Sequence, residues 1–193
     1  MNVPKVAVIG CGRIAWMLEK DTLRYKPCTH LGALFYWQKK QKAQITTLCD
    51  TQIEYAKAAA KFFSLKNVEF LNNPERVIQT KPDFLVIATN TPSHYDLLTQ
   101  ALYAKIPRIV VEKPVAWSVR EAKLLRKKIA KSTSVILPNY ERRYHPKYIA
   151  LQKKIAHART YRGLFAAGGK SLYIDKKTGD EGVLLHDTTH LLD

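Results

Sequence analysis

The feature that most constrains the fold of this sequence is a series of short apolar segments with no alternation of polar residues. The clearest of them are Lys5–Ile9, Ile45–Cys49 and Asp83–Thr89. A strand with one face in water alternates apolar and polar residues, whereas a strand buried on both faces is apolar throughout. These segments therefore predict strands of a parallel sheet with helices on both faces.

Longer segments rich in helix-forming residues separate the apolar runs. The segment Gln52–Phe63 contains four alanines and no helix breaker, and Ser118 with Glu121 forms the capping-box pattern of a helix start. Asn73 followed by Pro74 indicates another helix start. Further strands are predicted at 68–71, 109–112 and 135–138, and a further helix at 93–104. Strands alternating with helices at this spacing predict an α/β fold with a doubly wound parallel sheet.

The pattern changes after about residue 139. A helix is predicted at Pro146–Ile155, a strand with a glycine irregularity at Gly163–Tyr173, and the start of another helix at Glu181–Asp193. We therefore expect two domains, with a boundary between about residues 120 and 140. We assign residues 1–120 to the first domain and residues 121–193 to a second, α+β domain.

Charge and composition narrow the range of partners. The chain has 32 Lys and Arg against 16 Asp and Glu, a formal net charge of +16. Such a surplus attracts polyanions. A nucleic-acid function would rest on charge alone, because no helix-turn-helix, zinc or aromatic RNA-binding motif accompanies it. We expect the basic clusters to be solvated surface and nucleic acid not to be a partner.

The sequence also argues against a membrane or secreted protein. It has no run of the roughly 18 apolar residues that a membrane span requires, and its start does not resemble a secretory signal. The three cysteines, Cys11, Cys28 and Cys49, show no CxxC spacing, so we expect reduced thiols, no metal site and a cytoplasmic location.

A glycine-rich pattern directly follows the first predicted strand. Gly10-Cys11-Gly12-Arg13-Ile14-Ala15 has the form G-x-G-x-x-A, in which the first glycine permits a tight turn and the second allows a diphosphate to approach the backbone. The helix expected next would direct its N–H groups and partial positive charge at the phosphates. The alternative is an ordinary strand-to-helix turn. We favour a dinucleotide site because the pattern lies between a strand and a helix.

Asp50 ends the second predicted strand, where a carboxylate can accept hydrogen bonds from ribose hydroxyls and repel a 2′-phosphate. This favours NAD, with NADP as the alternative. Asp50 lies 35 residues after Ala15, whereas the pattern expects an acid roughly 20 residues on. We therefore expect an insertion within Asp21–Lys42. Asp50 would also serve as a cap for the next helix, and the two roles are compatible.

Two further polar segments end predicted strands. Thr89 and Asn90 follow the fourth strand, and their side chains suit a nicotinamide ribose, although helix capping by Asn90, Thr91 or Ser93 explains the same residues equally well. Glu112 and Lys113 end the fifth strand. A lysine there would donate a hydrogen bond to a substrate oxygen, although a loop lysine is ordinarily a solvated charge.

Taken together, the motifs resemble the Gfo/Idh/MocA oxidoreductases, the family of glucose–fructose oxidoreductase and inositol 2-dehydrogenase. The matching segments, in chain order, are VAVIGCGRIA (6–15), LCD (48–50), ATNTPSH (88–94), VEKP (111–114), RRYHP (142–146) and GVLLHDTTHLLD (182–193). The resemblance implies a Rossmann domain followed by an α+β domain that covers the substrate. Members of the family are longer than 193 residues, which implies that the second domain here is partial.

The resemblance also implies the roles of individual residues. Those that would line the dinucleotide site are Gly10, Gly12, Arg13, Ile14, Asp50, Thr89, Asn90, His94 and Glu112. Lys113 would position and polarise the reacting oxygen, and His190 would take the hydroxyl proton. Many members carry an aspartate four residues before that histidine, where this chain has His186 with Asp187 beside it.

These observations lead to one expected function and one alternative. We expect an NAD(P)-dependent oxidoreductase that transfers hydride between a nicotinamide and a secondary alcohol of a sugar, cyclitol or related polyol. The alternative is a truncated, catalytically inactive dinucleotide-binding module that needs a partner chain. Apolar surface left exposed by a partial second domain would favour a homo-oligomer.

Overall fold

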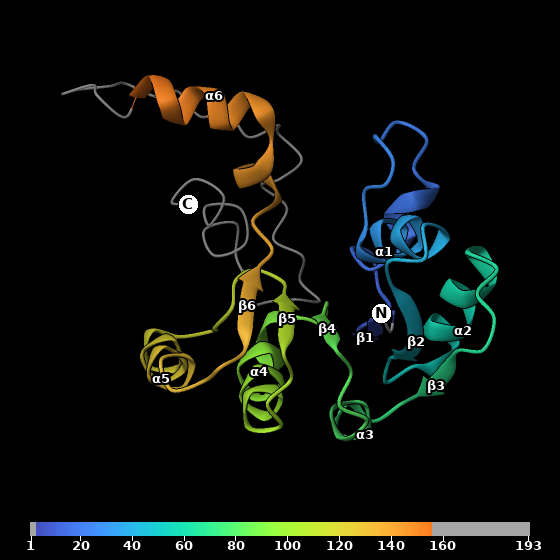
Figure 1. Ribbon diagram of the computed structural model, residues 1–193, viewed down its shortest axis with the longest axis horizontal. Helices are drawn as coiled ribbons and strands as arrows, with labels where there is room; N and C mark the ends of the chain where they lie inside the picture. Colours follow the sequence, from blue (N-terminus) through green and yellow to red (C-terminus); the bar gives the residue numbers. More distant parts are fainter. Residues whose placement is uncertain (1–2, 156–193) are drawn as a thin grey trace, which may run out of the picture. The chain divides into compact units, whose positions relative to one another are not determined.

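The computed structural model describes residues 3–155 and divides the chain into two units, residues 1–138 and residues 139–193. The first unit is built on a six-stranded parallel sheet in the order β3-β2-β1-β4-β5-β6 (Figure 1). Its strands are β1 (Lys5–Ile9), β2 (Gln44–Cys49), β3 (Glu69–Leu71), β4 (Phe84–Ile87), β5 (Arg108–Val111) and β6 (Val135–Pro138). This is a doubly wound Rossmann sheet, so the predicted fold class is confirmed.

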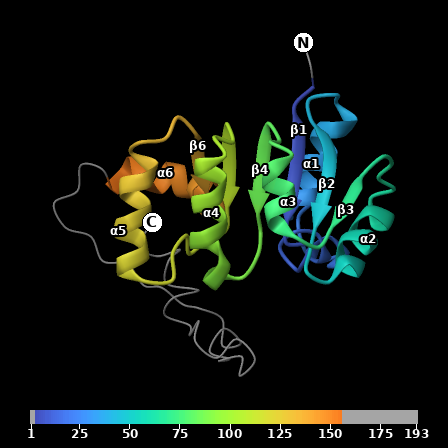
Figure 2. The same cartoon turned by 90° about the horizontal axis from the view of Figure 1, so that it is seen from below.

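Helices cover both faces of this sheet. They are α1 (His30–Lys39), α2 (Ile53–Phe62), α3 (Pro74–Gln79), α4 (His94–Tyr103) and α5 (Val119–Ile129). Figure 2 shows α3, α4 and α5 side by side on one face. Alternate residues of β1 divide the core: Ala7 and Ile9 pack with α3, α4 and α5, whereas Val8 packs with α1 and α2. Burial on both faces accounts for the apolar character of the strands.

Two helix starts match the sequence patterns closely. The Asn73 side chain accepts a hydrogen bond from the Glu75 N–H, 2.8 Å away, with Pro74 in the first turn of α3. The Ser118 hydroxyl accepts one from the Glu121 N–H, 3.2 Å away, at the start of α5. Both side chains satisfy backbone donors that the helix itself leaves unpaired.

The segment after the glycine pattern differs from the prediction of an immediate helix. One turn forms, in which Trp16 N–H donates to Gly12 O over 3.2 Å, and the short 3₁₀ helix η1 (Met17–Lys20) follows. The α-helix α1 begins only at His30. A continuous helix through this segment would place Pro27 in its interior, where proline removes a hydrogen bond and clashes with the preceding turn.

The first turn and α1 are nevertheless joined by hydrogen bonds. His30 N–H donates to Ile14 O over 3.3 Å, and Leu31 N–H donates to Ala15 O over 2.9 Å. In an unbroken helix Ala15 O would accept from residue 19, four residues on. Here Ala15 O accepts from Leu31, twelve residues later than in an unbroken helix. The first turn and α1 therefore follow the hydrogen-bond pattern of one helix that is interrupted by twelve inserted residues. We call residues 16–29, which contain them, the splice loop.

Glu19 fastens the splice loop to the start of α1. Its Oε1 accepts hydrogen bonds from Cys28 N–H (2.7 Å), Thr29 N–H (3.0 Å) and Thr29 Oγ1 (2.9 Å). Thr29 Oγ1 in turn caps α1 by accepting from Gly32 N–H over 3.1 Å. The Glu19 side chain is 8% exposed, so water competes little for these bonds.

The boundary between the two units lies within the range of residues 120–140, later than the end at residue 120 assigned to the first domain. Strand β6 pairs in parallel with β5, and Leu125 of α5 is buried in the core, so both elements belong to the first unit, which ends at Pro138. The described part of the second unit contains η3 (Glu141–Tyr144) and α6 (Pro146–Ile155), and α6 has the predicted bounds. His145 starts α6 by accepting from Lys147 N–H through Nδ1, 3.2 Å away.

Within residues 3–155, none of the helices is both long enough and apolar enough to cross a bilayer.

The Glu19 contacts lead to a stability prediction. Glu19→Ala should lower the free energy of unfolding by roughly 2 kcal/mol or more, because three donors lose a charged acceptor in a buried setting. The control is Glu54→Ala, whose side chain is 78% exposed and pairs with Lys57 on the surface, and which should change stability by less than about 0.5 kcal/mol. Urea unfolding measures both, and equal values would contradict the fastening role.

Candidate active site

Polar residues and glycines follow four neighbouring strands at the same edge of the sheet. Gly10 follows β1, Asp50 follows β2, Thr89 lies two residues beyond β4, and Glu112 follows β5. Because the strands are parallel, their carboxyl ends meet at one edge, and open α/β sheets bind ligands there at the point where the strand order reverses. In this sheet that point lies between β1 and β4.

Gly10 occupies a backbone position that only glycine accepts readily. Its φ is +90°, and a Cβ added there would lie 2.5 Å from Ala88 O at the end of β4. The Gly10 N–H donates to Cys49 O over 2.8 Å, and Ala88 N–H donates to Ile9 O over 2.7 Å. The loop therefore leaves the sheet pressed against β4, as predicted for the first glycine of the pattern.

Gly12 is in a different situation. A Cβ added there would find no atom of the described residues within 4 Å, and its φ lies outside the left-handed region. Space is thus open beside the backbone of the first turn. Arg13 is exposed and Ile14 half-buried in that turn, while their carbonyl oxygens accept from Leu18 and His30.

Asp50 is hydrogen-bonded to the glycine loop itself. Its Oδ2 accepts from Cys11 N–H over 2.8 Å, and its Oδ1 accepts from Gln52 N–H over 2.9 Å, just before α2. Asp50 does not cap α2 as expected, because Gln52 is the N-cap of that helix and no side chain makes a capping hydrogen bond there. Without the twelve inserted residues, Asp50 lies 23 rather than 35 residues after Ala15, close to the spacing that the pattern expects.

The two cysteines of this edge are unsuited to nucleophilic chemistry. Burial, and secondarily the nearby Asp50 carboxylate, raise the pKa of Cys11 well above its ordinary range and that of Cys49 to about 12. A thiol attacks as the thiolate, so both are inert near neutral pH. The Cys11 Sγ lies 3.6 Å from Cys49 O and acts as a small packed donor.

The loop after β4 places a hydroxyl pair and an amide at the edge. Ser93 Oγ lies 2.7 Å from Thr89 Oγ1 and 2.8 Å from Asn90 O. Helix capping was the alternative explanation of this segment. In the described chain neither the Asn90 nor the Ser93 side chain makes a capping hydrogen bond to η2 (Thr91–Ser93) or α4, and Asn90 is exposed.

His94 lies beneath the edge and is only 1% exposed. Its Nδ1 is 2.7 Å from Pro114 O and its Nε2 is 2.9 Å from Thr89 O. The ring therefore joins the loop after β4 to the loop after β5. His94 would therefore affect a dinucleotide site indirectly, by holding the two loops that carry these carbonyl groups.

Glu112 is also buried, and its partner was not expected from the sequence. Its Oε1 lies 2.7 Å from Nε2 of His30, with the side chains 9% and 10% exposed. Glu112 N–H donates to Ile87 O over 2.9 Å. His30 was missed because the splice loop separates it from the glycine pattern. The available signal was Thr29, a typical helix cap directly before it.

Lys113 follows Glu112 and is half-buried, and its peptide bond to Pro114 is cis. It lies at the same edge as the glycine loop, as predicted. The three remaining predicted residues, His186, Asp187 and His190, lie outside the described residues.

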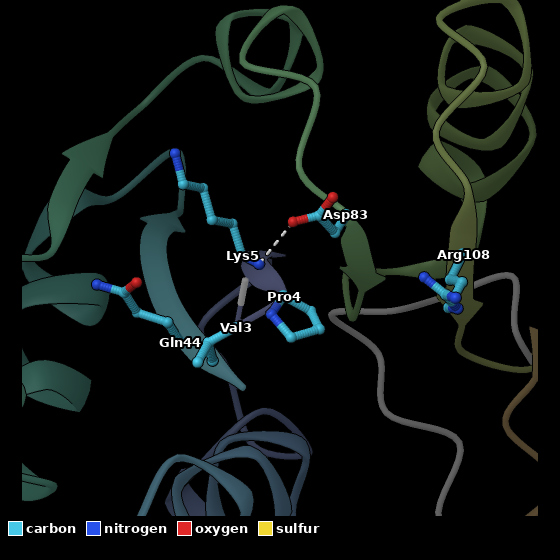
Figure 3. Close-up of a pocket in the computed structure, with 6 residues that line it drawn as sticks. All are labelled: Val3, Pro4, Lys5, Gln44, Asp83 and Arg108. Carbon is cyan, nitrogen blue, oxygen red and sulfur yellow. Dashed lines mark hydrogen bonds between the residues drawn. The ribbon is translucent and has the colours of Figure 1, made fainter. Parts of the chain in front are cut away.

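A pocket of about 650 Å³ lies at the opposite edge of the sheet. It is lined by Val3, Pro4, Lys5, Gln44, Asp83 and Arg108, near the amino ends of the strands (Figure 3). There the Lys5 N–H donates to Asp83 Oδ2 over 2.8 Å. Since ligands of parallel sheets bind at the carboxyl ends, this pocket is not part of the candidate site. Across residues 3–155, His, Cys, Asp and Glu form no group of three that would hold a metal.

The chain is similar to known dehydrogenases in sequence and in fold. It is 29% identical over 121 residues to D-apiose dehydrogenase of Paraburkholderia graminis, an alignment that covers 63% of this chain and 28% of that protein. Two solved structures share the fold at 18% identity. Scyllo-inositol dehydrogenase of Lactobacillus casei, solved with NAD(H) and scyllo-inositol, has a TM-score of 0.63 over 80% of this chain and 41% of that one.

The second structure is the WlbA dehydrogenase of Bordetella pertussis in complex with NADH and UDP-GlcNAcA. It has a TM-score of 0.72 over 98% of this chain and 56% of that one. The chain thus spans between about a quarter and just over half the length of these relatives.

The family assignment comes from a match over residues 4–140, which contain the whole sheet and every described residue of the candidate site. The matching model is GFO_IDH_MocA, an oxidoreductase family with an NAD-binding Rossmann fold. The chain therefore belongs to the Gfo/Idh/MocA oxidoreductase family.

Proposed function

We propose that this protein is an NAD(P)-dependent oxidoreductase that transfers hydride between a nicotinamide and a secondary alcohol of a sugar, cyclitol or related polyol. The observation that carries the proposal is the meeting of the glycine loop, Asp50 and Lys113 at one edge of the sheet. Family membership and relatives named for D-apiose and scyllo-inositol support the substrate class.

The residues present fit a dinucleotide. The open space at Gly12 leaves room for a diphosphate against the backbone of the single turn that precedes η1. Gly10, Gly12, Arg13 and Ile14 would hold the diphosphate in this proposal. Asp50 retains lone pairs beyond its two hydrogen bonds and would accept from the adenosine ribose. Its charge favours NAD over NADP.

The other end of the dinucleotide would lie toward β4 and β5. The exposed Asn90 and the Thr89 hydroxyl would contact the nicotinamide ribose. His94 and Glu112, both buried, would contribute by holding their loops in place. All nine proposed cofactor residues follow one of four neighbouring strands, β1, β2, β4 and β5, at the carboxyl edge of the sheet.

In the reaction, the bound nicotinamide would supply a hydride acceptor. Lys113 would donate a hydrogen bond from its ammonium group to the substrate oxygen, stabilising negative charge on that oxygen as its proton departs. His190, assigned by resemblance, would take the hydroxyl proton, since a neutral imidazole near its working pKa suits that role. Asp187, beside His186, would either substitute for the aspartate that many members carry, or the reaction would proceed without that carboxylate.

An inactive dinucleotide-binding module that needs a partner chain is the alternative proposal. It shares the glycine loop and Asp50 with the first and differs only in turnover. Steady-state formation of NADH across a panel of polyols separates the two, because the alternative binds NAD and forms none. We place the protein in the cytoplasm as a homo-oligomer, and light scattering that finds a monomer would count against the latter.

The open space at Gly12 leads to a binding prediction. Gly12→Ala should leave thermal stability nearly unchanged, because the added methyl group meets none of the described atoms. It should weaken NAD binding at least about tenfold, or about 1.4 kcal/mol, because the methyl group occupies the diphosphate's approach. Calorimetric titration with NAD and NADP measures this, and an unchanged dissociation constant would contradict the placement.

Gly10→Ala is the companion variant to Gly12→Ala. It should lower stability by roughly 1–3 kcal/mol, because its φ is positive and the new Cβ would contact Ala88 O. Equal stability of the two variants would show that the two glycines do not play separate roles.

Lys113 leads to a kinetic prediction. Lys113→Ala should reduce turnover of the best polyol by at least about a hundredfold, while the NAD dissociation constant changes little, because the lysine contacts the substrate oxygen rather than the dinucleotide. Lys66→Ala, at an exposed loop position, is the matched control and should behave like the unaltered protein. Parallel loss of NAD binding and turnover would refute the assignment.

A further inference from the structure

The residues on either side of Lys113 are each held by an imidazole from a different helix. Before it, the carboxylate of Glu112 contacts His30 at the start of α1. After it, the carbonyl of Pro114 contacts His94 at the start of α4. The backbone is fixed as well, because Glu112 N–H donates to Ile87 O.

The His30–Glu112 contact is short and shielded from water. Nε2 and Oε1 are 2.7 Å apart, and both side chains are at most 10% exposed. In such a setting a hydrogen bond is electrostatically stronger than in water, so removal of His30 takes a strong buried contact from the Glu112 carboxylate. A displaced Glu112 would carry Lys113 with it, since the two residues are consecutive.

His30 itself is anchored to the glycine loop. Its N–H donates to Ile14 O, and Ile14 belongs to the turn that follows Gly12. The contact with Glu112 therefore links the turn after β1 to the tip of β5, across the end of β4. The two residues are 82 positions apart in the sequence.

From this arrangement we infer that His30 is a positioning residue that sets the place of Lys113 relative to the glycine loop. The inference rests on the proposed function for its kinetic consequence, but its structural part holds for the protein without ligand. His30 touches neither dinucleotide nor substrate in this proposal. It acts through Glu112, with His94 holding the far side of the same three-residue segment.

The structural part is tested by amide hydrogen exchange on the unliganded protein. His30→Ala should raise the exchange rate of a peptide spanning residues 109–116 by about tenfold or more, because the Glu112 carboxylate loses its buried contact with His30. The exchange rates of peptides from β2 and α2 should stay unchanged. His30→Gln should restore much of the protection, since its amide donates a hydrogen bond to Glu112.

His145→Ala is the matched control, because His145 is exposed and starts α6 in the second unit. Should His30→Ala fail to fold, His30→Leu keeps most of the side-chain volume and removes the donor. Exchange in His30→Leu that equals that in His30→Gln would overturn the inference. So would unchanged protection in His30→Ala.

The kinetic part separates positioning from general destabilisation. His30→Ala should lower kcat about tenfold or more with a change of less than about threefold in the NADH dissociation constant measured by fluorescence, because a small misplacement of a reacting group costs rate. His30→Gln should recover most of kcat. Equal kcat in the unaltered protein and His30→Ala would overturn the inference.

The two hypotheses fail in different ways. If the unaltered protein binds neither NADH nor NADPH, the proposed function fails, while the exchange experiment still decides whether His30 holds Glu112. If NADH binds and His30→Ala changes neither exchange nor kcat, only the role of His30 fails.

Discussion

Burial of a parallel sheet on both faces is the constraint on which this structure depends. It makes β1, β2, β4 and β5 apolar, and it requires crossover helices that return each strand in the same direction. As a result the loops that carry the candidate site residues all leave the sheet at its carboxyl edge. Few polar side chains are buried among the described residues, and two of them, His94 and Glu112, lie where the strands end.

The second constraint is the continuity of the helix that follows the glycine loop. Hydrogen bonds from His30 and Leu31 to Ile14 and Ala15 keep its two parts in register although the splice loop separates them. Glu19 closes the base of that loop with three bonds through one oxygen. The backbone geometry of the first turn is thereby compatible with a long interruption.

Much of this fold could be predicted from the sequence, because strand burial and helix capping are local properties. The strands, the caps at Asn73 and Ser118, and the bounds of α6 follow from short patterns. The insertion was expected within Asp21–Lys42, but it lies within residues 16–29. Its exact place could not be predicted, since the register across it depends on backbone bonds between residues distant in sequence. For the same reason His30 was missed, whereas Asp50 was proposed from its place at a strand end, and Lys113 from its place together with the family resemblance.

The splice loop allows this edge of the sheet to vary in evolution. Both its ends are fixed within one turn of a single helix, so its length is uncoupled from the distance between Gly12 and His30. Leu23 and Tyr25 lie in its outer part and are 95% and 96% exposed. Neither belongs to the hydrophobic core of the first unit. Segments of other lengths and compositions can therefore replace the splice loop, which changes the surface beside the candidate site while the strand ends stay in place.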